Sequence, residues 1–175
     1  MSAPDGALAD AKALLRLDAA DEDALIGTMI GAAIGVCERF TGLSLLAADR
    51  SDTIPAVPGP GWQRLPATPV AAITSVTLLD VAGMATPLGV DAYAIDIDAA
   101  GDGWVRVSAP VCGSRVAVGY RAGLAADWPS LPEALRQGVL RLVAHLYAHR
   151  DVMTDLGPPA VVAALWRPWR RMRLA

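Results

Sequence analysis

The spacing of apolar residues divides the chain into a helical start, a middle of short strands and a helical end. Along residues 5–17 and 18–41, apolar side chains recur every three or four positions, and this spacing predicts two amphipathic helices. The same spacing returns over residues 130–151 and again over 160–166. We therefore expect two helices before the strands and two after them.

Candidate capping residues mark the ends of these helices. Asp18 or Asp21 is placed to cap the second helix, and Gly42 is placed to end it. Ser130 and Glu133 have the spacing of a capping box at the start of the third helix.

Between residues 50 and 122 the pattern changes to short β-branched segments separated by proline and glycine. It predicts strands at 72–80, 92–98, 103–109 and 114–122, with a hairpin turn between the second and third. Local pairing of these strands would give a small meander or barrel. The sequence thus predicts an α+β fold, a helical bundle built from the N- and C-terminal helices with an inserted small antiparallel β subdomain.

This pattern also predicts how the chain is organised into segments. In chain order we expect N-terminal core helices, a β insertion, a long core helix, and a short helix with a C-terminal tail. Their predicted ranges are 1–48, 49–124, 125–157 and 158–175.

Length and composition indicate a folded protein with its own hydrophobic core, since 54% of the 175 residues are apolar. The N-terminus lacks the pattern of a signal peptide. The longest apolar run, residues 24–37, is shorter than the roughly 20 residues of a membrane helix. Cys37 and Cys112 are far apart, without metal-site spacing. We expect a soluble, cytosolic protein without a disulfide and without a membrane partner.

Charge is unevenly distributed along the chain, although the formal net charge is only −3. Residues 1–24 carry six acidic side chains against Lys12 and Arg16, whereas seven arginines follow Leu131. Two differently charged ends favour an assembly role or an anionic partner.

The two histidines, His145 and His149, have the helical spacing of a zinc-binding pair. Leu146 stands where a zinc protease has its glutamate, and Arg141 one turn earlier would repel a cation. Solvated or interface histidines are therefore the favoured interpretation.

Other candidate chemistry is equally weak. Asp96 and Asp98 could form a carboxylate pair, but their alternation with isoleucines is typical of a half-solvated strand. Cys112 has no neighbouring histidine. The sequence therefore predicts no catalytic residue, no metal site and no cofactor.

Three glycines, Gly27, Gly31 and Gly35, line one face of the second predicted helix. Each costs roughly 1 kcal/mol relative to alanine in a helix interior, so another backbone is expected to approach closely. The favoured interpretation is a helix crossing inside the core, and the alternative is packing between subunits.

The C-terminal segment, "ALWRPWRRMRLA", combines tryptophan with arginine and has no acidic side chain. A membrane anchor would be short and broken by proline, and clustered arginines could also contact DNA. We favour docking to a protein, because tryptophan and arginine are enriched among interface hot spots. The residues proposed for docking are Trp166, Arg167, Trp169, Arg170, Arg171 and Arg173.

Four segments, taken in order, resemble the head–tail connector (adaptor) proteins of tailed bacteriophages, including the adaptor of gene transfer agents. Residues 15–42 resemble the family's opening and end in "ERFTG", and residues 65–80 ("LPATPVAAITSVTLLD") resemble its strand entry. Residues 116–151 and 158–175 resemble its long helix and its arginine-rich ending. This chain departs from the family by Gly138 in place of alanine and by Trp169 in place of tyrosine.

The resemblance implies a structural protein of the virion neck that is assembled in the bacterial host cytoplasm. Such adaptors form a ring, typically dodecameric, whose C-terminal segments dock onto the portal protein and whose other side receives the stopper or tail-completion protein. Packaged DNA passes through the channel without sequence-specific contact. The free subunit would be monomeric, with its tail ordered only by the portal. The alternatives are another neck component, such as a stopper or tail terminator, or a nucleic-acid-binding protein that uses the basic tail.

Overall fold

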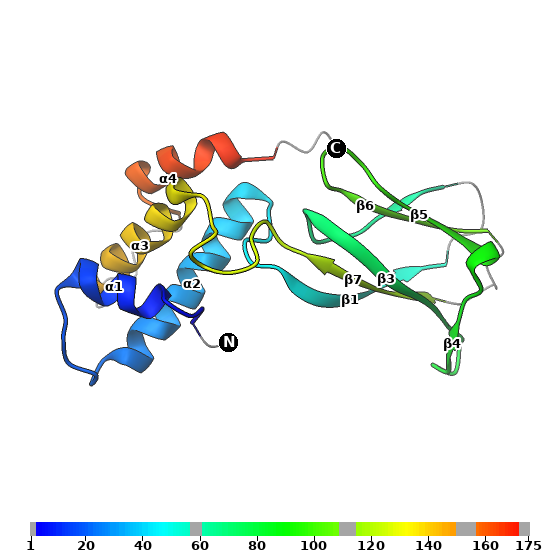
Figure 1. The fold of residues 1–175 in the computed structure, drawn as a ribbon, viewed down its shortest axis with the longest axis horizontal. Coiled ribbons are helices and arrows are strands. Elements are labelled where there is room, and N and C mark those ends of the chain that lie inside the picture. Colours follow the sequence, from blue (N-terminus) through cyan, green and yellow to red (C-terminus); the bar gives the residue numbers. More distant parts are fainter. Residues whose placement is uncertain (1–2, 57–60, 109–114, 150–156, 172–175) are drawn as a thin grey trace. The chain divides into compact units, whose positions relative to one another are not determined.

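The computed structural model describes residues 3–56, 61–108, 115–149 and 157–171, and the chain divides into two compact units (Figure 1). The helical unit combines Met1–Leu46 with Ala125–Ala175, and the β unit is Ala47–Leu124. The predicted α+β fold is confirmed, since the N- and C-terminal helices share one unit and the strands are inserted between them.

Helices of the described residues form a small bundle in the helical unit. In chain order they are α1 (Ala7–Leu15), α2 (Asp23–Thr41), α3 (Glu133–Ala148), α4 (Ala160–Trp166) and a 3₁₀ turn, η2 (Arg167–Trp169). α2 packs against α3, α1 packs against both, and α4 packs mainly on α3 (Figure 1).

The central helix, α2, has an apolar face that packs into this bundle. Its buried residues are Ile26, Ile30, Ala33, Ile34, Cys37 and Thr41. Among the described helices, α2 is the one with the length and apolar composition of a membrane-spanning helix. The core helix of a soluble protein has the same properties, and the packing of α2 on α1 and α3 accounts for its composition.

The predicted helix ends are only partly correct. Gly42 ends α2 in the left-handed conformation (φ 74°), and its N–H donates to the Glu38 carbonyl at 2.8 Å, as expected. Glu22, rather than Asp18 or Asp21, occupies the N-cap of α2 and makes no side-chain capping bond.

The predicted capping box of α3 is wrong. α3 begins at Glu133 with Pro132 at the N-cap, so Ser130 lies outside the capping position. Instead, the Asp127 carboxylate accepts the Ser130 N–H at 2.9 Å, which closes a turn before the helix.

The β unit contains two antiparallel sheets within the described residues. The first has the order β1 (Ala48–Pro55), β7 (Arg115–Ala122), β3 (Val70–Leu79) and β4 (Ala85–Pro87). The second has the order β2 (Gln63–Arg64), β6 (Gly103–Val107) and β5 (Tyr93–Ile97), and a 3₁₀ turn, η1 (Val90–Ala92), precedes β5.

Side chains from both sheets meet in one hydrophobic core. Its fully buried members include Val105 from β6 and Val116, Val118 and Tyr120 from β7. The Tyr120 hydroxyl donates to the Asp52 carboxylate, so the one polar group of this side chain is satisfied. Burial, with a smaller contribution from Asp52, raises the pKa of Tyr120 to about 12.

The sheets are not the local meander considered from the sequence. The β5–β6 hairpin forms as predicted, but β7 pairs with β1 and β3, which lie far earlier in the chain. β1 itself was not predicted, because Ile54 is its one buried side chain and the strand shows no regular alternation.

Candidate docking surface

The predicted docking residues lie on α4, on η2 and just after it, at one end of the helical bundle (Figure 1). Pro159 stands at the N-cap of α4, and Pro168 lies inside η2. Trp166 is the last residue of α4, Arg167 and Trp169 belong to η2, and Arg170 follows.

Trp166 is a core residue of the helical unit and is fully buried. Its Nε1–H donates to the Leu135 carbonyl at 3.4 Å, and its ring centroid lies 5.9 Å from that of Phe40. A Cβ added at Gly138 would lie 2.7 Å from Cε2 of the indole and closer still to Nε1. The glycine therefore makes room on α3 for this ring. The expectation that Trp166 enters a groove of another protein is corrected, because its own chain already encloses it.

The residues after η2 are fixed to the C-terminal end of α2. The Arg171 N–H donates to the Thr41 carbonyl at 2.8 Å, and the Arg170 guanidinium carbon lies 5.7 Å from the Phe40 ring centroid. Guanidinium groups near the last turn of α2 also favour the negative end of its dipole. The expected unstructured tail is therefore ordered through Arg171, and Arg173 lies outside the described residues.

Four of the proposed docking residues remain available on the surface, and we call them the basic corner. Arg167 and Arg170 are exposed, whereas Trp169 and Arg171 are half-buried. Guanidinium groups can form paired hydrogen bonds with carboxylates, and the half-exposed indole offers apolar area beside them. The arrangement suits an acidic protein surface.

The three glycines of α2 differ in their surroundings. A Cβ added at Gly27 would lie 3.9 Å from the Cβ of Ala3, so the N-terminal segment approaches there. Around Gly31 and Gly35, none of the described atoms that could meet an added Cβ lies within 4 Å. The favoured crossing within the core is therefore not found at these two glycines in the described part of the chain. Packing between subunits stays a prediction.

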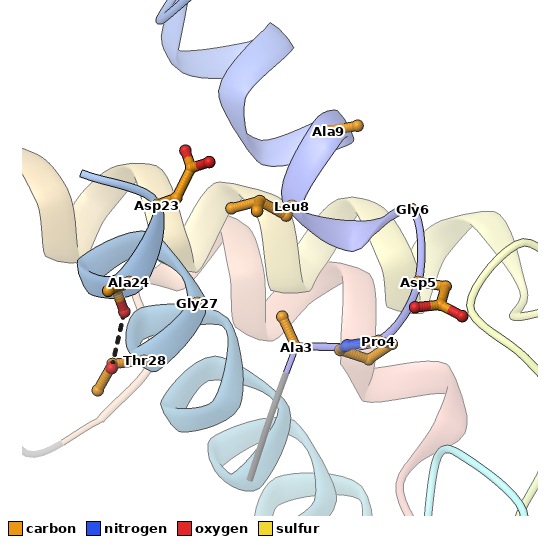
Figure 2. A pocket seen from close by; sticks show the side chains of 10 residues that line it. All are labelled: Ala3, Pro4, Asp5, Gly6, Leu8, Ala9, Asp23, Ala24, Gly27 and Thr28. Carbon is orange, nitrogen blue, oxygen red and sulfur yellow. Dashed lines mark hydrogen bonds between the residues drawn. The ribbon is translucent and has the colours of Figure 1, made fainter. Parts of the chain in front are cut away.

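A hollow of about 560 Å³ lies between the N-terminal segment and the first turns of α2 (Figure 2). Asp5, Leu8 and Thr28 are among its lining residues, and much of the rest is alanine and glycine. Asp23, on its edge, forms an ion pair with Lys12 at 2.7 Å. The few polar groups give this hollow little capacity for specific small-molecule binding.

A second depression, of about 490 Å³, lies between α2 and α3, and we call it the α2–α3 groove. Its lining is apolar except for Arg39, which is exposed. The lining residues are Ala32, Val36, Arg39, Phe40, Leu142, Leu146, Gly157 and Pro158.

The candidate metal ligands do not form a metal site within the residues that the structure describes. The His145 and His149 ring centroids are 4.3 Å apart, and Nδ1 of His149 lies 2.9 Å from the His145 carbonyl oxygen. No group of three His, Cys, Asp or Glu side chains in the described ranges is placed to hold an ion.

Asp98 stabilises the β5–β6 turn. Its carboxylate accepts hydrogen bonds from the Trp104 indole and from the Ala100 and Asp102 N–H groups, each at 2.9 Å. These bonds, first the one from Trp104, lower the pKa of Asp98. Asp96 lies exposed on β5, and Cys112 lies outside the described residues. Burial raises the pKa of the Cys37 thiol to about 12, so this cysteine is poorly suited to be a nucleophile.

Comparison with known proteins identifies similar chains of known origin. Residues 6–82 match the family described as phage gp6-like head–tail connector protein. The chain is 30% identical to one in the neck of an empty gene transfer agent (GTA) particle, computed with C6 symmetry, with a TM-score of 0.80 over 96% of this chain and 90% of the other.

Two further structures give the same result. A chain in the virion of a native GTA particle is 30% identical, with a TM-score of 0.78 over 100% of this chain and 95% of the other. A chain in the neck of a native GTA particle, computed with C12 symmetry, is also 30% identical, with a TM-score of 0.75 over 100% of this chain and 94% of the other. Among curated proteins, none matches this chain.

Proposed function

We propose that this chain, which belongs to the phage gp6-like head–tail connector family, is a ring-forming structural protein in the neck of a tailed phage or gene transfer agent particle. The observation that carries the proposal is the likeness to a neck chain over nearly the whole length, in both units of the fold. In this role the protein joins the portal to the stopper or tail and continues the DNA channel, and it needs no catalytic group.

A ring of twelve copies is supported by the symmetry of a similar neck. The native GTA neck was computed with C12 symmetry, and that of the empty particle with C6 symmetry. A closed ring repeats one small contact at every subunit, so modest individual contacts add up to a stable assembly. Gly31 and Gly35 offer open backbone on α2 where a neighbouring subunit could approach closely.

The basic corner is the proposed contact with the portal protein. Arg167 and Arg170 present exposed guanidinium groups on a segment that is already ordered. An ordered segment loses less conformational entropy on docking than an unstructured tail would. Trp166 contributes indirectly, because it holds α4 on α3 and so positions Arg167 and Trp169.

Binding to the portal protein of the same particle tests this assignment. We expect Arg167→Glu and Trp169→Ala each to weaken binding by about thirtyfold, the effect of losing a hot-spot side chain. Arg141→Glu is the matched control, since Arg141 is exposed on α3, away from the basic corner, and should leave binding unchanged. Undiminished binding by both corner variants would show that the portal uses another surface.

A further inference from the structure

We infer that the α2–α3 groove of one copy receives the acidic corner of the next copy, where α1 ends and α2 begins. The acidic corner consists of Leu14, Asp18, Asp21 and Leu25. The inference rests on the proposed function, because it names the surfaces through which subunits of the proposed ring meet.

The groove offers an apolar floor with a cation at its rim. Val36, Leu142 and Leu146 line it, and Phe40 closes one end. Arg39 lies in the last turn of α2 with an exposed side chain. Within the described residues, Arg39 forms no ion pair. Such a surface fits a ligand that combines apolar side chains with carboxylates.

The acidic corner has this combination. Leu14 is 47% exposed and Leu25 is 40% exposed, although both are large and apolar. Asp18 and Asp21 are exposed on the connection between the two helices. The ion pair between Lys12 and Asp23 joins the end of α1 to the start of α2, so the two leucines project from a fixed turn.

The two surfaces lie at different ends of the same helix. Leu25 and Arg39 are separated by about 21 Å along α2, at 1.5 Å per residue. A cyclic ring requires each subunit to present two different, complementary surfaces, one to each neighbour. Opposite charges on them favour the correct pairing, because like charges facing each other at an interface are strongly unfavourable.

A two-fold pair of antiparallel α2 helices would satisfy the same charges but would stop at two copies. The cyclic symmetry of the similar necks favours the open succession of contacts that closes into a ring. The occupant of the groove is therefore a neighbouring copy within the ring.

Charge reversal in particles tests the pairing. Particles are purified from cells that produce each variant, and the amount of this chain in them is measured relative to the capsid protein. We expect at least about tenfold less chain for Arg39→Glu and for Asp18→Arg combined with Asp21→Arg, because each places like charges together. The variant that carries all three substitutions should recover most of the loss, and Arg141→Glu should cause none. Normal incorporation of both single-surface variants, or no recovery in the combined one, would overturn the inference.

Covalent linkage distinguishes a ring contact from a pair. With Cys112→Ser as background, Arg39→Cys and Asp18→Cys are introduced together, and the assembled particles are oxidised. Cys37 is buried and should not react. We expect a ladder of linked chains beyond the dimer, and no ladder from either single cysteine. A product that stops at dimers, or no product although the chain is in the neck, would overturn the pairing and leave the proposed function intact. A native chain that is missing from the neck would overturn both.

Discussion

At the scale of single residues, Gly138 and Trp166 determine how the C-terminal segment is held. The indole occupies the space that any larger residue at 138 would need. It also fills a fully buried position between α3 and Phe40. The pair therefore forms one packing unit, in which the missing side chain of one residue accommodates the large side chain of the other.

Gly138→Ala should destabilise the free chain, even though alanine favours helices. Overpacking against Trp166 is expected to cost about 1–3 kcal/mol, measured by urea unfolding with tryptophan fluorescence. Gly31→Ala is the control, since it also replaces a helical glycine but meets no described neighbour within 4 Å. It should raise the unfolding free energy by up to about 1 kcal/mol. Equal effects of the two substitutions would contradict the packing described.

Sequence reasoning could not separate Trp166 from Trp169, because both stand among arginines. A weak signal was present, since Val162 and Trp166 are four residues apart and share one face of a short helix. The depth of that face depends on Gly138, 28 positions earlier in the chain. A contact of this kind follows from tertiary packing and is not visible in local spacing.

At the scale of elements, what could be predicted depended on periodicity. α2, α3 and α4 were predictable from their apolar stripes, and β7 from its alternation of buried and exposed residues. The edge strand β1 was missed, because it is mostly exposed and is held by pairing with β7 across the length of the unit. Helix starts were also mispredicted, since several acidic residues near α2 were equally plausible caps.

α4 should behave as part of the core and not as a detachable tail. Removing residues 158–175 deletes Val162 and Trp166, which are both almost fully buried. Loss of the tryptophan alone is expected to cost about 3–5 kcal/mol, so the truncated helical unit should melt at a lower temperature. Removing only residues 172–175 should leave melting unchanged, as followed by circular dichroism. If the longer truncation kept the melting temperature of the intact chain, the packing of α4 would be refuted.

For the same reason, deleting the C-terminal segment is a poor test of docking, because it would damage the fold as well as the basic corner. Point substitutions at Arg167 and Trp169 avoid this, since Arg167 is exposed and Trp169 is only half-buried.

At the scale of the whole molecule, unequal charge is a property of the helical unit that suits a ring. Acidic side chains gather where α1 meets α2, and arginines gather at the end of α2 and beyond α4. One end can then meet a neighbouring subunit while the basic corner meets the portal. The proposed contacts are individually small, and their repetition around the ring gives the assembly its strength.

Electron cryomicroscopy of the neck in purified particles tests the central claim most directly. We predict a ring of twelve copies of this chain, consistent with the C12 symmetry of the similar neck, with the helical and β units both recognisable in each copy. A neck whose density is fully accounted for by other proteins would contradict the claim.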